Sequence, residues 1–159
     1  MDFQISPLSP EPFSHLFGQD NEFLAAQGVQ RMTVDVSPGY PCRVSLEDAR
    51  VGESVLLLNY QHQSAATPYR SSYAIFVREG AEMAAPAVNE VPESLRLRLL
   101  SLRAFTAGGM LIDADVVHGR EVDPALRKLL ADERVRYVHI HNAKPGCYAA
   151  RAERAGDAQ

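Results

Sequence analysis

The stretch Tyr137-Val138-His139-Ile140-His141 alternates polar and apolar side chains with the period of two that is typical of a β-strand. This period sends Val138 and Ile140 to one face of the strand and the two histidines to the other. The apolar pair predicts contact with a hydrophobic core, so both imidazoles project together from the opposite face, about 7 Å apart. The residues leave open whether that face surrounds a ligand or is solvated.

A turn and a cysteine follow this strand. Pro145-Gly146 favours a tight turn, and Cys147 comes directly after it. An earlier Pro-Gly pair, at 38–39, stands three residues before Cys42, the other of the two cysteines. We expect the polar segment 152–159 at the end of the chain to be a frayed tail.

The rest of the chain predicts one α+β domain over residues 1–159. Asp20 is typical of the residue that begins a helix, and Gly28 of the position just after one. The run 54–60 is apolar on both faces and predicts a central strand, followed by a polar loop over 61–72. We expect a mixed, mostly antiparallel sheet with several short helices. The predicted strands are 3–5, 31–36, 54–60, 73–79, 102–106, 110–117 and 135–141, and the predicted helices are 10–17, 20–26, 92–100 and 123–130.

Composition is that of a globular domain and argues against several classes of partner. The 159 residues are 46% hydrophobic and 23% charged, with a formal net charge of −4. The sequence has no dense cluster of Lys and Arg, so we expect no nucleic-acid binding, and no apolar run is long enough to span a membrane. The N-terminal residues do not form a basic, apolar leader, so we expect a cytoplasmic protein with reduced thiols. Cys42 and Cys147 are then more simply explained as free, reactive or metal-bound, and a disulfide between them would require an unusual redox context.

The stretch also contains the parts of a nucleophilic site. A thiol in a tight polar turn near cations favours the thiolate, which is the reactive form. Cys147 is the predicted nucleophile, His139 or His141 the base, and Asn142 the amide that orients the base. The alternative is that Cys147 is a small buried residue whose role is packing.

Cations in constrained loops predict an anionic ligand. Arg43 and Arg70 both lie in loops stiffened by proline, beside Cys42 and Tyr69. A guanidinium binds carboxylate or phosphate through paired hydrogen bonds. The predicted ligand-binding residues are Arg43, Arg70, Tyr69 and Lys144. Any one of these arginines alone is more simply explained as part of a surface ion pair.

These residues leave three functions open. The first is a small-molecule enzyme or binding protein with a Cys/His pocket for an anionic ligand and no cofactor. The second is a zinc site, in which His139, His141, Cys42 and Cys147 provide a mixed nitrogen and sulfur ligand set. The third is a non-enzymatic interaction domain that forms a homodimer through the polar face of the strand.

Six segments between residues 38 and 151 form a further pattern. They are 38–49 (PGYPCRVSLEDA), 52–60 (GESVLLLNY), 68–70 (PYR), 75–79 (IFVRE), 101–105 (SLRAF) and 139–151 (HIHNAKPGCYAAR). Together they resemble a family of uncharacterised, stand-alone bacterial proteins, and the resemblance covers nearly the whole chain. The resemblance implies a bacterial domain of unknown function and assigns no catalytic or binding residue.

Overall fold

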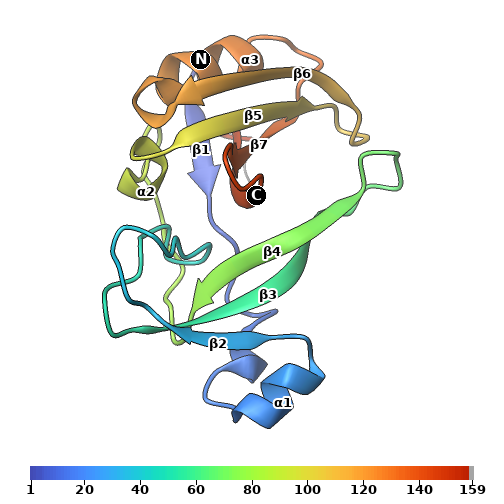
Figure 1. Ribbon diagram of the computed structural model, residues 1–159. Coiled ribbons are helices and arrows are strands. Elements are labelled where there is room, and N and C mark those ends of the chain that lie inside the picture. Colours follow the sequence, from blue (N-terminus) through green and yellow to red (C-terminus); the bar gives the residue numbers. More distant parts are fainter. Residues whose placement is uncertain (158–159) are drawn as a thin grey trace.

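Two antiparallel sheets and a few short helices make up the fold (Figure 1). In the computed structural model, which describes residues 1–157, the larger sheet has the strand order β1-β8-β7-β5-β6 and the smaller one the order β2-β3-β4. The strands are β1 (Phe3–Ser6), β2 (Gln30–Thr33), β3 (Ser54–Gln63), β4 (Ser71–Arg78), β5 (Leu99–Phe105), β6 (Leu111–His118), β7 (Tyr137–Asn142) and β8 (Tyr148–Arg154). The helices are η1 (Ser14–Leu16), α1 (Asn21–Ala26), α2 (Glu93–Arg96), η2 (Gly119–Glu121) and α3 (Val122–Leu130). The predicted α+β class is confirmed, and the strands form two sheets instead of one.

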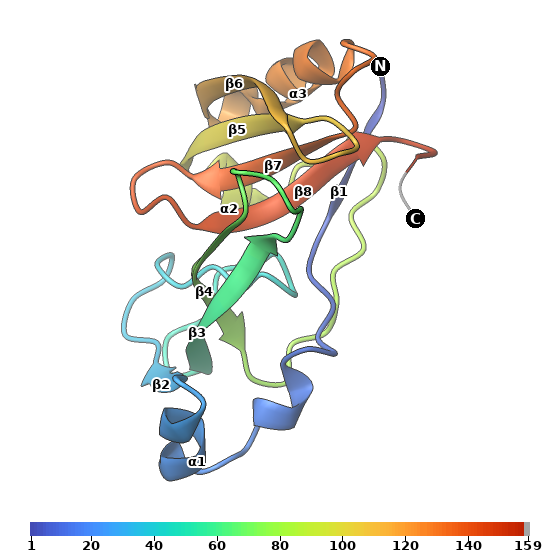
Figure 2. The same ribbon diagram turned by 90° about the vertical axis from the view of Figure 1, so that its right-hand side faces the viewer.

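Helix α3 covers the face of the larger sheet that points away from β3 and β4 (Figures 1 and 2). Leu126 and Leu130 of α3 are fully buried in one hydrophobic cluster with Val138 and Ile140 of β7. Burying an aliphatic side chain of this size contributes about 2 kcal/mol. The predicted core face of β7 is therefore confirmed, and its opposite face is directed at the smaller sheet.

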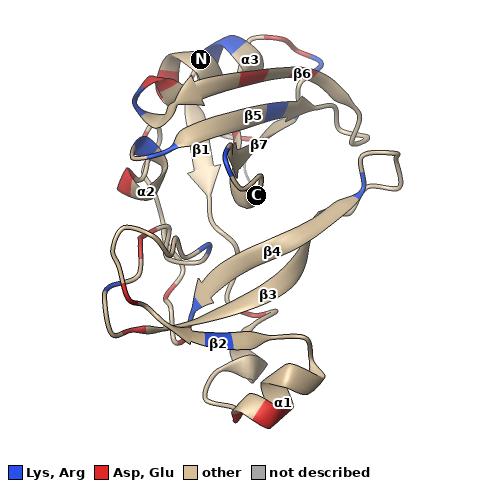
Figure 3. Cartoon of the chain, viewed as in Figure 1, with Lys and Arg blue, Asp and Glu red and all other residues tan. Residues whose placement is uncertain are grey.

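The smaller sheet has its own core, around β3. This strand is central, as its apolar run predicts, and Leu56 and Leu58 are buried in a cluster with Leu24 of α1. The carboxylate of Asp20 begins α1 by accepting a hydrogen bond from the backbone N–H of Phe23 at 2.7 Å, as the sequence predicts. Figure 3 shows β3 and β4 almost entirely uncharged along their length. The smaller sheet thus presents apolar and neutral polar groups to the larger one.

The last strand, β8, includes residues for which the sequence predicts a frayed tail. It lies between β1 and β7, and Ala150 and Ala152 are fully buried in the α3 core. The prediction for 152–159 is wrong for residues 152–154, because small alanine side chains pack closely there despite their low β propensity. Residues 155–157 form a turn, and 158–159 lie outside the described residues.

Strand β3 is longer than the sequence predicts. It continues to Gln63 through part of the predicted polar loop 61–72, with a β-bulge between Tyr60 and Gln63, and β4 begins at Ser71. The polar side chains at this end of the strand find partners on β7. Gln63 Nε2, for example, donates a hydrogen bond to the hydroxyl of Tyr137 at 2.9 Å. The extension brings His62 to the larger sheet.

Two predicted helices are shorter in the structure. The helix predicted over 10–17 is reduced to the single turn Ser14–Leu16, because Pro12 lacks a backbone donor and disfavours helical geometry in the residue before it. The helix predicted over 92–100 ends at Arg96, because Leu99 already pairs with His118 in the larger sheet. Strand pairing overrides the helical spacing of the leucines.

Candidate functional site

The inner face of β7 carries a group of imidazoles. His139 and His141 are only 3% and 1% exposed, so both project together from the strand, as predicted, into a buried environment. His62 of β3 is the third member, with its ring centroid 4.9 Å from that of His141 and 6.2 Å from that of His139. The ring of Tyr148 stacks on His62, with centroids 5.7 Å apart, and meets the other two imidazoles edge-on. The three histidines are therefore held by packing between the two sheets.

A cavity of about 190 Å³ lies beside these imidazoles, and we call it the histidine pocket. Its lining includes His62, Tyr69, Arg103, Phe105, His139 and His141. Burial lowers the pKa of His139 to about 3 and that of His141 to about 4, and it also lowers the pKa of His62. All three imidazoles are therefore neutral near pH 7.

Hydrogen bonding distinguishes the histidines from one another. His141 Nδ1 lies 2.9 Å from the carbonyl oxygen of Gly146, so this nitrogen carries the proton and Nε2 is an acceptor. The Nδ1 atoms of His62 and His139 are buried and have no hydrogen-bond partner in the described residues. The protein thus fixes the tautomer of His141 but not that of His139.

A second, larger cavity of about 460 Å³ contains the cysteine, and we call it the thiol pocket. It lies where the loop around Arg43, strand β4, the segment 97–99 and the turn between β7 and β8 meet. Its apolar lining includes Leu57, Phe76 and Leu99. Its charged lining consists of Arg43, Arg98 and Lys144, and the described residues contribute no Asp or Glu to it. The pocket is thus apolar with a cationic side.

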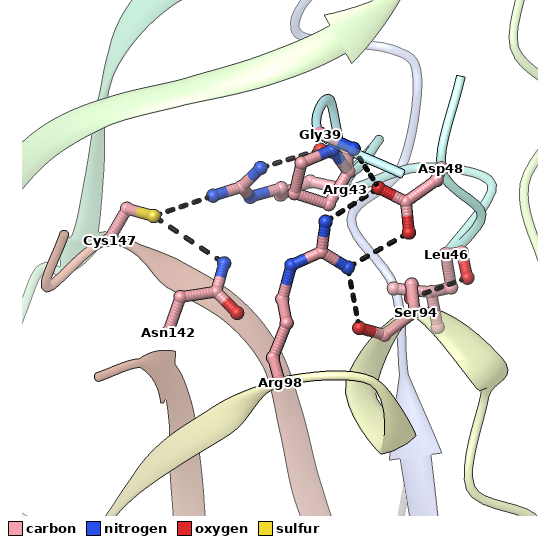
Figure 4. A network of polar contacts seen from close by, with 9 residues as sticks. Gly39, Arg43, Leu46, Asp48, Ser94, Arg98, Asn142 and Cys147 are labelled. Carbon is pink, nitrogen blue, oxygen red and sulfur yellow. Dashed lines mark hydrogen bonds and ion pairs between the residues drawn. The ribbon is translucent and has the colours of Figure 1, made fainter. Parts of the chain in front are cut away.

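Arg43 is the central residue of the thiol pocket (Figure 4). Its side chain is 2% exposed and donates to the carbonyl oxygens of Tyr148 at 2.8 Å and Pro41 at 2.5 Å, and to Cys147 Sγ at 3.0 Å. Asn142 Nδ2 donates to the same sulfur at 3.5 Å. Burial lowers the pKa of Arg43, and the contact with Cys147 opposes that shift. Within residues 1–157, Arg43 forms no ion pair with a carboxylate, so the sulfur is the atom beside it best able to carry the opposite charge.

Arg98 also lines the pocket, but its charge is neutralised by a carboxylate (Figure 4). Its guanidinium forms two hydrogen bonds with the carboxylate of Asp48, at 2.6 and 2.8 Å, and a third with the carbonyl oxygen of Ser94 at 2.7 Å. The backbone N–H of Gly39 also donates to Asp48, at 3.1 Å. This bidentate contact fastens the loop around Arg43, through Asp48, to the residue just before β5.

The predicted site residues fall into three places. Cys147, Asn142, Arg43 and Lys144 line the thiol pocket, whereas His139, His141 and Tyr69 line the histidine pocket. The two linings share no residue, so the single Cys/His pocket expected from the sequence corresponds to two cavities. Arg70 lies in neither: its exposed guanidinium donates to the carbonyl oxygens of Ser64 and Ala65 in its own loop.

The cysteines do not form a shared centre with the histidines. Both are free and buried, and Cys42 Sγ accepts a hydrogen bond from the backbone N–H of Arg78 at 3.3 Å. Among residues 1–157, no three His, Cys, Asp or Glu residues are arranged to hold a metal ion. The geometry thus does not assemble His139, His141, Cys42 and Cys147 into a zinc site.

Sequence reasoning missed His62 and Arg98, which line these cavities, and Tyr148, which contacts residues of both. His62 was hidden in a polar run that resembles a loop, although the Tyr60-Gln61-His62 alternation continues the strand before it. Arg98 lies in a leucine-rich segment with helical spacing. Tyr148 joins the two cavities, because its backbone carbonyl accepts from Arg43 while its ring packs on the histidines. Alternation alone could have identified His62; the other two depend on contacts between distant segments.

Comparison with known proteins places the chain in a family without assigning an activity. No helix within residues 1–157 has the length and apolar character needed to cross a membrane. No curated protein and no solved structure matches the chain. The family model described as "Protein of unknown function (DUF1203)" matches residues 39–154, which include β3 to β8 and both cavities. The chain belongs to the DUF1203 family.

Proposed function

We propose that the protein binds a small organic anion in the thiol pocket, and that Cys147 is the reactive group at the bound molecule. The apolar part of the ligand packs against Leu57, Phe76 and Leu99, and its anionic group lies at the cationic side of the pocket. A cavity of about 460 Å³ is the size of a small metabolite rather than a macromolecular surface.

The observation that carries this proposal is the environment of Arg43. A guanidinium that is 2% exposed and lacks a carboxylate partner is costly in an unliganded protein, because buried charge is destabilising unless it is paired. Lys144 adds a second charge that no ion pair within residues 1–157 neutralises. Both features become favourable when an anion occupies the pocket.

The same arrangement gives Cys147 its role. Two side-chain donors, from Arg43 and Asn142, point at the sulfur and stabilise negative charge on it. In this proposal Arg43, and not a histidine, promotes the thiolate, since no hydrogen bond among the described residues joins an imidazole to the sulfur. The chemistry that fits is binding of an electrophilic or redox-active anion beside a thiolate.

Matched acid and amide pairs test the binding proposal. Hexanoate is expected to bind at least about tenfold more tightly than hexanamide, because the two differ only in the charge that the cations recognise. Lys144→Gln should weaken hexanoate binding by about three- to tenfold, measured by calorimetry. Lys128→Gln is the matched control, since Lys128 is exposed on α3 and does not line the pocket. Equal affinities for acid and amide, or equal effects of the two lysine substitutions, would contradict the proposal.

A further inference from the structure

The histidine pocket has a charge that its own lining does not balance. Arg103 of β5 contributes the formal positive charge there, and the described residues contribute no Asp or Glu to the lining. The hydrogen bond of its side chain is a long one, from Nε to Ser101 Oγ at 3.4 Å. The two terminal nitrogens of Arg103 have no partner within residues 1–157, and Arg103 forms no ion pair there. A partly buried guanidinium without an ion-pair partner favours the binding of an anion beside it.

The imidazoles add hydrogen-bonding capacity to the same cavity, where His139 is the register partner of Arg103 on the neighbouring strand. His139 is 3% exposed, and its Nδ1 has no partner, so no contact within the described chain holds its proton on that atom. The proton of the neutral ring is therefore free to occupy the other nitrogen and to be donated to a ligand oxygen. His62 has the same unpartnered Nδ1. His141 can donate from Nε2 once it takes up a proton, because its Nδ1–H is engaged by Gly146.

We propose that His62, His139, His141 and Arg103 form a binding site for a small oxyanion, separate from the thiol pocket. The cavity of about 190 Å³ admits a group of the size of sulfate, phosphate or a short carboxylate. Arg103 supplies paired donors for two oxygens, and the imidazoles supply the remaining donors. A metal ion is a poorer occupant, because the described residues offer no converging set of three ligands and an unpaired guanidinium faces the same space.

Binding should be linked to proton uptake. The groups that face His139 and His141 are His62 from β3, Arg103 from β5, Tyr148 and Arg151 from β8, and Tyr137 on the same strand, and the charge of Arg43 also acts on His141. Arg151 is paired with Glu153 at 2.6 Å, so the pocket as a whole is short of negative charge. An anion supplies that charge and stabilises protonated imidazole, which makes binding tighter as the pH falls.

Inorganic sulfate is a suitable probe because its charge is constant over the pH range in which histidine titrates. Isothermal titration should give a sulfate dissociation constant about twofold lower at pH 6.0 than at pH 7.5, with proton uptake visible as a dependence of the binding enthalpy on the buffer. Acetate forms the second arm: tighter binding of sulfate assigns the site to tetrahedral oxyanions, and tighter binding of acetate assigns it to carboxylates. Either result supports an oxyanion site.

Matched substitutions locate the binding. Arg103→Gln should weaken sulfate binding at least about tenfold, and Arg103→Lys, which keeps the charge, should restore part of it. His139→Gln should reduce the pH dependence more than the affinity at pH 7.5, where the imidazole is neutral. Arg70→Gln is the control, because this exposed arginine in the β3–β4 loop does not line the cavity.

Several results would overturn the proposal. The first is that neither sulfate nor acetate binds at about 10 mM and pH 6.0. The second is that Arg103→Gln and Arg70→Gln change the sulfate affinity equally. The third is that the protein binds zinc, that His139→Gln removes this binding, and that neither anion binds. Folding of each variant is verified by circular dichroism, and Arg103→Lys decides the matter if Arg103→Gln does not fold. Hexanoate binding in the thiol pocket is measured separately, and it should not change in Arg103→Gln, so the two sites succeed or fail independently.

Discussion

Replacing Arg43 with methionine is expected to slow the alkylation of Cys147 by about 30-fold near pH 7. The guanidinium donates to the sulfur at 3.0 Å in a pocket where no carboxylate among the described residues competes for it. Removing this hydrogen bond to the charged sulfur withdraws roughly 2 kcal/mol of thiolate stabilisation, which is the usual net contribution of a hydrogen bond to a charged group. Methionine keeps a long apolar side chain in place, so the shape of the pocket changes little.

The alkylation rate is followed by mass spectrometry on the peptide that contains Cys147. A small uncharged thiol in the same sample is the reference, since Cys42 is buried and directly precedes Arg43 in the sequence. Arg43→Lys should retain more than half of the effect because it retains the charge. The difference between the wild-type and methionine variants should become smaller as the pH rises, because more thiolate then forms without the guanidinium. A deficit that persists at high pH would mean that Arg43 controls access to the sulfur and not its charge.

As the pH is lowered, the protein should begin to lose stability at a higher pH than titration of its carboxylates alone would cause. The folded-state pKa of His139 is about 3 and that of His141 about 4, whereas an unfolded histidine titrates near 6.5. The unfolded chain therefore binds more protons below pH 6.5, and the free energy of unfolding falls as the pH decreases through this window. Two such histidines lower it by about 4 kcal/mol between pH 7 and pH 5. Carboxylates such as Glu79, whose pKa hydrogen bonding by Arg31 lowers to about 2, contribute mainly at lower pH.

Urea unfolding at several pH values in sulfonate buffers measures this dependence. The double variant His139→Gln/His141→Gln should lose most of the slope between pH 7 and pH 5, because glutamine does not titrate. His15→Gln is the control, since His15 is exposed on η1. An unchanged slope in the double variant would show that the two buried imidazoles are not the groups that take up protons on unfolding.

Local sequence patterns were sufficient for most of the fold. The alternation in β7 correctly separates Val138 and Ile140 from the two histidines, because a strand with one apolar face has a single favourable orientation on a core. The same reasoning fails for β8, where the buried face consists of alanines and gives no hydrophobic contrast. It also fails at His62, because the end of β3 is polar in sequence and is held as a strand by its contact with the larger sheet.

The candidate sites were less accessible from the sequence than the fold. Arg43 and Arg70 are similar as residues in proline-containing loops, yet one is buried against Cys147 and the other is exposed. The contact between Arg43 and Cys147 spans 104 positions, and the pairing of His62 with His141 depends on how the two sheets face each other. A single sequence contains no local pattern that predicts contacts between residues so far apart. The sequence therefore identified the reactive residue types but did not show that they lie in two separate cavities.

The most direct test of the central claim compares two alkylating reagents of nearly equal size at Cys147, one anionic and one neutral. Iodoacetate and iodoacetamide form the same carbon–sulfur bond and release iodide, and they differ in the charge that Arg43 and Lys144 should attract. If the thiol pocket binds anions, the ratio of the iodoacetate rate to the iodoacetamide rate should be at least about tenfold higher at Cys147 than for a small uncharged reference thiol. A ratio equal to that of the reference thiol would contradict the claim that this pocket recognises an anion.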